Sequence, residues 1–185
     1  MVLATRTTQE ISLMKDTIEH PALRNPVDVE VILDRIEDCR DSCLDFVRQA
    51  QRAVEIFSYD LDAVLYDQQP FLAAIKNLCL RSQFSQVRIL LQNNAQVQKQ
   101  GHRLVELVRR LPSSMEIRRP HPDYINHQEN FLLADQKAYI RWSLSRRYRG
   151  YATPGNRLKA QQLSELFNEI WQCSRPDSEL RRLNL

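Results

Sequence analysis

The amino-acid sequence predicts an α/β fold in which a mixed, mostly parallel sheet is flanked by helices. Short apolar segments of strand length alternate along the chain with longer amphipathic segments of helix length. The expected strands are residues 54–59, 87–91 and 115–118, and the helices between them are residues 71–80 and 99–111. Strands that are joined through helices usually pair in parallel by right-handed crossovers. This alternation is why most of the sheet is expected to be parallel.

Two more amphipathic helices are expected outside this alternation. The first begins near Val31 and repeats apolar residues at three- and four-residue steps through Leu33, Ile36, Cys39, Cys43, Phe46, Val47 and Ala50. The last covers residues 156–171, with Phe167 and Trp171 among its core residues. Residues 1–27 are polar and carry two prolines, so they are expected to form a loosely attached arm ahead of one domain, residues 28–185.

Composition limits the possible functions. The chain has 185 residues, 43% of them hydrophobic, and a net charge of only +3, so an anion-binding surface must come from local clustering. No apolar run is long enough to span a bilayer. The four cysteines form no Cys-x-x-Cys pair, and Cys39 and Cys43, one helical turn apart, suit a core. We therefore expect a cytoplasmic protein with no cofactor and no metal site.

Residues 126–145 are typical of a β-hairpin. Residues 131–134 and 138–142 are expected to form its strands, with a tight turn at residues 135–137. The hairpin brings polar residues before the first strand, among them His127 and Asn130, close to those after the second. Six basic residues come next with no acidic residue among them: Arg141, Arg146, Arg147, Arg149, Arg157 and Lys159.

With this hairpin the chain resembles one half of the phospholipase D superfamily over roughly residues 39–174. The signature of that family is His-x-Lys-x-x-x-x-Asp, followed after the return strand by a Gly-Ser step and then an Asn. Asp135 matches the Asp of the signature, Ser143 matches the Ser, and Ser145 stands where the Asn would be. The positions of the His and the Lys are occupied by Gln128 and Asn130. The resemblance implies a phospholipase D-like half-domain with a degenerate motif.

In the resembling family the His attacks phosphorus and the Lys offsets the charge of the phosphate, and neither Gln128 nor Asn130 can do this. The closest candidate nucleophile is His127, one residue out of register, but Glu129 beside it would repel a phosphate. Enzymatic activity is therefore not expected. The alternative is a divergent phosphodiesterase or nuclease that uses His127 at a homodimer interface.

Without catalysis, the resemblance implies a domain that binds a phosphate-containing ligand or a protein partner. The expected ligand-binding residues are Asn130, Asp135, Arg141, Ser143, Ser145, Arg146, Arg147 and Arg149. Nucleic acid is a less favoured ligand because the charge of the whole chain is modest. A structural or interaction domain without a ligand is a further alternative.

Two other expectations concern assembly and the end of the first expected strand. Single-copy members of the family pair two identical chains to complete a site, so a homodimer is expected. Asp60, Asp62 and Asp67 follow residues 54–59, where ligand sites of α/β proteins occur. A capped, solvated loop before a helix is the favoured interpretation of these aspartates over a metal site.

Overall fold

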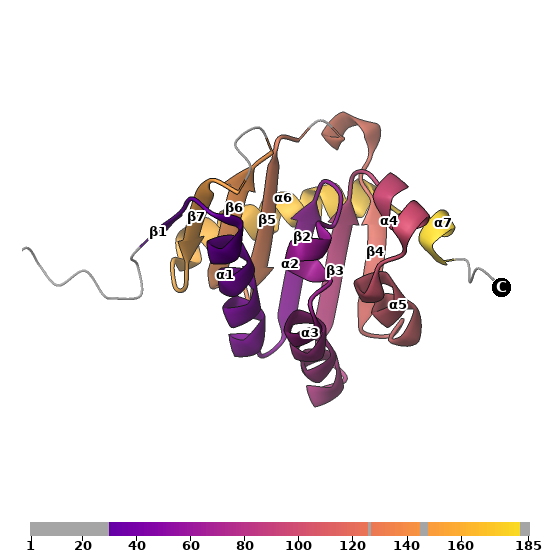
Figure 1. The fold of residues 1–185 in the computed structure, drawn as a ribbon, viewed down its shortest axis with the longest axis horizontal. Helices are drawn as coiled ribbons and strands as arrows, with labels where there is room; N and C mark the ends of the chain where they lie inside the picture. Colours follow the sequence, from indigo (N-terminus) through magenta and orange to yellow (C-terminus); the bar gives the residue numbers. More distant parts are fainter. Residues whose placement is uncertain (1–29, 126, 145–147, 182–185) are drawn as a thin grey trace, which may run out of the picture.

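The computed structural model describes residues 30–125, 127–144 and 148–181 (Figure 1). The expected arm, residues 1–27, lies outside this part of the chain. The strands are β1 (Val31–Leu33), β2 (Ala53–Ser58), β3 (Gln86–Leu91), β4 (Met115–Arg119), β5 (Glu129–Ala134), β6 (Ala138–Ser143), β7 (Gly150–Thr153) and β8 (Arg175–Pro176). The helices are α1 (Ile36–Gln49), α2 (Ala63–Tyr66), α3 (Gln69–Arg81), α4 (Ala95–Gln100), α5 (Arg103–Arg110), the 3₁₀ turn η2 (Pro122–Tyr124), α6 (Arg157–Cys173) and α7 (Ser178–Arg181).

The strands form one sheet in the order β1-β7-β6-β5-β2-β3-β4-β8, with helices on both faces. The α/β fold is therefore confirmed, and β2, β3 and β4 pair in parallel as expected. The expectation that the sheet is mostly parallel is wrong, because the other neighbouring pairs in this part of the chain are antiparallel. A turn of three residues between β5 and β6 can join only antiparallel strands, and β5 then pairs antiparallel with β2.

Two expected helices have different boundaries in the structure. Residues 31–33 belong to β1, which pairs with β7 at the edge of the sheet, and the first helix begins only at Ile36. The helix expected over residues 99–111 is divided into α4 and α5. Gly101 ends α4 with φ 72°, and the Nδ1 atom of His102 accepts a hydrogen bond from the backbone N–H of Leu104 at 3.2 Å to start α5.

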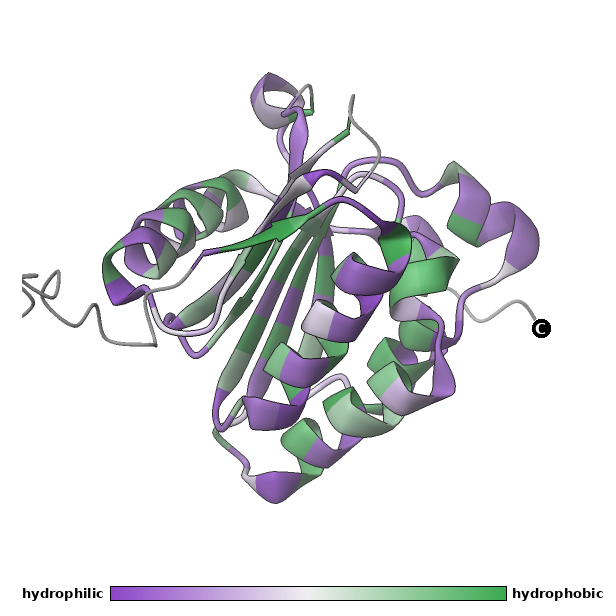
Figure 2. Ribbon diagram, turned by 60° about the vertical axis from the view of Figure 1, so that its left-hand side comes forward, coloured by the Kyte–Doolittle hydropathy of each residue, from purple (hydrophilic) through white to green (hydrophobic). Residues whose placement is uncertain are grey.

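The sheet separates two hydrophobic layers. Helices α1, α2, α3 and α5 cover one face, called the front face here because it faces the viewer in Figure 1, and α6 crosses the other face, the back. Figure 2 shows the strands, rich in apolar residues, between α6 on the left and the remaining helices on the right. Cys39 and Cys43 are buried in the front layer, as predicted. The back layer consists of Phe57, Leu90, Phe131, Leu133, Tyr139, Ala160, Phe167, Ile170 and Trp171.

A polar cluster within the back layer fixes α6 to the sheet. Arg88 donates to the buried carboxylate of Glu55 and, at 2.8 Å, to Asn168 Oδ1. The hydroxyl of Ser164 donates to the other Glu55 oxygen at 3.0 Å. The guanidinium of Arg88 also lies 5.1 Å from the ring centroid of Phe167, within cation–π range. These contacts hold α6 in one orientation relative to the sheet, and they also compensate the buried charge of Glu55.

Candidate functional site

Three of the motif positions meet at one end of the central strands, the upper end in Figure 1, where β2 and β6 end and β5 begins. Gln128, Asn130 and Ser143 line a pocket of about 470 Å³ at this end, which we call the motif pocket. Its other lining residues are Ser58, Tyr59, Asp60, Asp62, Tyr66, Trp142, Leu144 and Tyr148. The hairpin therefore does bring together the polar residues that precede its first strand and follow its second.

Asn130 fixes the geometry of the motif pocket. Its side chain is 6% exposed, and its Oδ1 atom accepts a hydrogen bond from the backbone N–H of Tyr59 at 2.7 Å. Strand alternation places Asn130 on the same face of β5 as Leu132, which belongs to the front layer. A neutral amide thus occupies the position at which the resembling family has a lysine, and it ties β5 to the loop after β2.

The motif pocket is acidic. Asp62 caps α2, because its Oδ1 atom accepts from the backbone N–H of Val64 at 2.9 Å, and its Oδ2 atom accepts from the hydroxyl of Tyr148. Burial, followed by the negative charge of Asp62, raises the pKa of Asp60. Among the lining residues that the structure describes, none carries a positive charge. The capping role expected for this loop is confirmed for Asp62, and the same loop supplies the charge of the pocket.

His127 does not line the motif pocket. Its ring packs edge-on against Phe57, with centroids 5.0 Å apart, and against Phe131, both of them in the back layer. Its Nε2 atom is buried and has no hydrogen-bond partner within the described ranges. Burial lowers the pKa of His127, although the charge of Glu129 acts in the opposite direction. The expectation of a catalytic His127 does not fit this placement, since the ring lies on the opposite side of β5 from Gln128 and Asn130.

Asp135 lies at the far end of β5 from the pocket. Its carboxylate accepts hydrogen bonds from the backbone N–H groups of Gln51 at 2.7 Å and of Arg52 and Ala53 at 2.8 Å each. The residue has φ 53°, a conformation that Asp and Asn tolerate in turns. The carboxylate of Asp135 is thus engaged in the fold away from the motif pocket, and its ligand-binding role stays a prediction. The motif aspartate closes the hairpin turn and fixes the start of β2.

The structure describes part of the basic segment. Arg141 is opposite Phe131 in the β5–β6 register, on the back face, and its guanidinium lies 3.8 Å from the carboxylate of Glu129. Arg149 lies 3.6 Å from the carboxylate of Asp34, before α1. Ser145, Arg146 and Arg147 lie outside the described residues. Arg141 and Arg149 thus each have an acidic neighbour, and neither lines the motif pocket.

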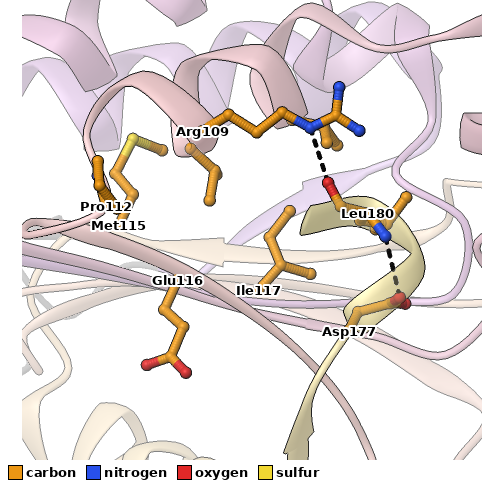
Figure 3. A pocket seen from close by; sticks show the side chains of 9 residues that line it. Arg109, Pro112, Met115, Glu116, Ile117, Asp177 and Leu180 are labelled. Atoms are coloured by element: carbon orange, nitrogen blue, oxygen red, sulfur yellow. Dashed lines mark hydrogen bonds between the residues drawn. The ribbon is translucent and has the colours of Figure 1, made fainter. Parts of the chain in front are cut away.

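A second cavity, of about 450 Å³, lies under α7 (Figure 3). Met115 and Ile117 from β4 and Leu180 from α7 give it apolar walls. Its polar groups serve the fold: Arg109 donates to the backbone carbonyl of Leu180 at 2.7 Å, and Asp177 accepts from the Leu180 N–H at 3.2 Å. We interpret this cavity as part of the surface against which α7 packs. The motif pocket is the better candidate site, because its polar side chains come from four segments and surround one space.

The tyrosines of the motif pocket were not predicted from the sequence. Tyr59 follows β2, Tyr66 ends α2, and Tyr148 precedes β7, so nothing in their spacing connects them. Only the position of Asp60 and Asp62 after a buried strand could have indicated this end of the strands. Tyr148 has φ 64°, so the chain turns there in a conformation that few residues with side chains adopt. Its hydroxyl can then reach Asp62.

Comparisons with known proteins agree with this fold. Residues 35–183 match a family described as a domain of unknown function, DUF7931. No curated protein matches the sequence. Among solved structures, the fold is similar to TrmBL2, an archaeal chromatin protein whose structure shows a novel mode of DNA binding, with a TM-score of 0.60 and 17% identity. That match covers 91% of this chain but only 60% of TrmBL2.

Two further solved structures have a similar fold. NucT from Helicobacter pylori matches with a TM-score of 0.56 and 12% identity, over 81% of this chain and 98% of NucT. Nuc from Salmonella typhimurium, a phospholipase D family member, matches with a TM-score of 0.53 and 12% identity, over 75% of this chain and 90% of Nuc. At these identities the likeness shows the fold. Separately, no helix in the described part of the chain has the length and apolar character needed to cross a membrane.

Proposed function

The chain belongs to the DUF7931 family of domains of unknown function, and we propose that it is a non-catalytic domain with the fold of phospholipase D proteins, which binds a ligand or a partner and cleaves nothing. One observation carries this proposal. The pocket formed by the motif positions holds Gln128 and Asn130 in place of the nucleophile and the cation. An amide is a poor nucleophile and has no fixed charge to offset a phosphate.

A hydrolysis assay tests the proposal. We expect purified protein to release no product from bis-p-nitrophenyl phosphate, phospholipid vesicles or single-stranded DNA above the level of the His127→Ala variant. The double variant Gln128→Ala with Asn130→Ala is the matched control for the pocket itself. Activity that disappears in His127→Ala would overturn the proposal and favour the divergent phosphodiesterase. Activity that disappears only in the double variant would overturn it too, and would assign the chemistry to the pocket.

A phosphate-bearing ligand, if bound, should contact the basic segment outside the motif pocket, because Asp60 and Asp62 repel an anion within it. The pairing of Arg149 with Asp34 is between two exposed side chains and costs little to break, so such arginines remain able to bind phosphate. Sulfate should then raise the melting temperature, and replacing both Arg146 and Arg147 by Ala should abolish that shift. Arg110→Ala, on exposed α5 surface, is the control. Duplex DNA in place of sulfate tests a nucleic acid as the source of phosphate.

Assembly as a homodimer is part of the same proposal. The resembling family completes its site with a second motif copy, and one chain of this protein carries one motif. Light scattering at micromolar concentration should give twice the chain mass of 21.8 kDa. A mass of one chain would remove the basis for a site shared by two copies.

A further inference from the structure

We propose that the motif pocket binds the ammonium or guanidinium group of an organic cation. This inference rests on the proposed function, since it names the chemistry of the ligand that a non-catalytic pocket would hold. Its argument comes from the charge, the aromatic residues and the unpaired hydroxyl of the pocket, and the negative charge is the opposite of what a phosphate site needs.

The charge of the pocket is uncompensated in the described part of the chain. Asp60 is half-buried, and none of the ion pairs formed by residues that the structure describes involves its carboxylate. Asp62 accepts hydrogen bonds from Val64 and Tyr148, both of which are neutral donors. Two neighbouring carboxylates without a cation repel one another, and burial strengthens that repulsion. A ligand with a positive charge would offset it.

Aromatic residues are also among those that line the pocket. Tyr59, Tyr66, Trp142 and Tyr148 come from four different elements or loops and line the same space as the two aspartates. The face of an aromatic ring carries partial negative charge and attracts ammonium and guanidinium groups within about 6 Å, an effect that increases when the cation loses water. Aromatic rings combined with carboxylates are the usual surroundings of a bound organic cation.

The hydroxyl of Tyr66 supplies an observation independent of the acidic pair. Tyr66 is fully buried, and its hydroxyl oxygen has no hydrogen-bond partner in the ranges that the structure describes. Buried polar groups without partners are rare, because each has lost its hydrogen bonds to water without replacing them. Burial raises the pKa of Tyr66, with nearby Cys43, Asp62, Cys39 and Asp60 acting in the same direction, so the hydroxyl stays neutral. Tyr66 lines the motif pocket, so this hydroxyl is an acceptor beside the pocket that no group of the described chain uses.

The pocket suits a group of several atoms better than a metal ion. Its volume of about 470 Å³ lies in the range of small-molecule sites. Over the described ranges, no group of three or more His, Cys, Asp or Glu side chains is arranged to hold a metal. The chemistry therefore fits a free amine, such as a polyamine, or an Arg or Lys side chain presented by a protein partner.

Calorimetric titration separates these sources. Spermidine and arginine amide are the free probes, and a short peptide with one central arginine between glycines is the protein-like probe. We expect one or more of them to bind the wild type, and Asp60→Asn to weaken that binding at least tenfold while preserving the shape of the side chain. Asp41→Asn, on the exposed surface of α1, removes the same charge from a residue that does not line the pocket and should leave binding unchanged. Tyr59→Leu should also weaken binding, since it removes a half-exposed ring.

Two results would overturn the inference: no probe binds the wild type, or Asp41→Asn reduces binding as much as Asp60→Asn does. Melting curves of the variants show whether each is folded. The hydrolysis assay keeps the two proposals apart. A protein that cleaves phosphodiesters contradicts the proposed function whatever the titration shows, and one that neither cleaves nor binds a probe contradicts only the cation site.

Discussion

The two faces of β5 have different surroundings, although neighbouring residues of the chain point to opposite faces. On the front face, Gln128 and Asn130 open into the motif pocket, where water and ligands can enter. On the back face, the ring of His127 packs edge-on against Phe131; His127 is partly buried, and Phe131 is fully buried against Phe167 of α6. The same strand thus builds a site on one side and a core on the other.

This difference shows how strongly strand register determines function. Side chains alternate between the faces of a strand, so a shift of one residue moves a group from the pocket to the core. His127 has the chemistry of a nucleophile, but its side chain lies on the back face. Gln128 lies on the front face, but its amide cannot act as a nucleophile. The predictions below test each side of this comparison.

The largest effect is expected for Phe131→Ala on the back face. The ring is fully buried and stacks on Phe57 with centroids 5.3 Å apart and on Phe167 edge-to-face. Truncating a buried Phe should lower the free energy of unfolding by about 3–5 kcal/mol. Urea denaturation followed by circular dichroism measures the loss. A loss under about 1 kcal/mol would mean that α6 is not seated as described.

Asp135→Ala should have the next largest effect, because it removes the acceptor of three backbone N–H groups at the start of β2. Hydrogen bonds to a charged group contribute about 1.5–3 kcal/mol each but do not add in full, so we expect a loss of about 2–3 kcal/mol. Asp135→Asn keeps one oxygen and tolerates the φ of 53°, so it should cost less. Equal losses in the two variants would contradict a role for the second carboxylate oxygen.

On the front face, Asn130→Ala should cost less than either, about 1–2 kcal/mol, since it removes one hydrogen bond to the N–H of Tyr59. Asn130→Asp keeps the acceptor but places a third carboxylate beside Asp60 and Asp62. Its unfolding free energy should therefore fall below that of the wild type at neutral pH and recover as the pH decreases. Chemical denaturation at two pH values measures both variants. A pH-independent Asn130→Asp variant would place the aspartates farther away.

The smallest effect at neutral to alkaline pH is expected for His127→Phe. The replacement keeps the aromatic contact with Phe57 and removes a buried nitrogen without a partner in the described ranges, so stability at pH 8 should change by less than about 1 kcal/mol. Burial lowers the pKa of His127 below its usual 6.5, so the unfolded chain binds the proton first as the pH falls. The wild type therefore loses stability through the window below pH 6.5.

His127→Phe should lose less over the same window because it lacks this group. Burial also lowers the pKa of His102, so part of the acid sensitivity should remain in the variant. Unfolding free energies between pH 8 and pH 5 test the prediction. An unchanged pH profile in His127→Phe would show that the ring is accessible to water when folded, and would return it to consideration as a functional group.

The parts of the fold that could be predicted from sequence are those with their signal in a short stretch. The hairpin at residues 129–143 and the strands that alternate with helices carry a clear apolar pattern. The strands β1 and β7 are only three and four residues long, too short to show the alternation of apolar and polar residues that indicates a strand. In addition, β7 lies within a segment whose most prominent feature is its arginines. The position of β5 beside β2 depends on long-range pairing that local patterns do not contain.

The site was predicted only in part for a similar reason. Counting along the motif brings Asn130 together with Ser143, and both line the motif pocket, because a hairpin fixes which residues lie near each other. The apolar run begins at Phe131, whereas β5 begins at Glu129, so the run alone does not indicate which face His127 lies on. The alternation of Phe131 and Leu133, extended to residue 127, places His127 on their face. The aspartates and tyrosines come from separate loops that only the folded chain brings together.

The place of β5 in the sheet also has a consequence for biosynthesis. β2 lies between β3 and β5, and its partner β5 begins more than 70 residues later in the chain. While the chain is being made, β2, β3 and β4 can assemble through local crossovers, yet the other side of β2 stays unpaired until the hairpin leaves the ribosome. Val54, Ile56 and Phe57 make that temporary edge strongly apolar, the type of edge that pairs with other chains. A nascent chain halted before residue 129 should therefore depend on chaperones more than the finished protein does.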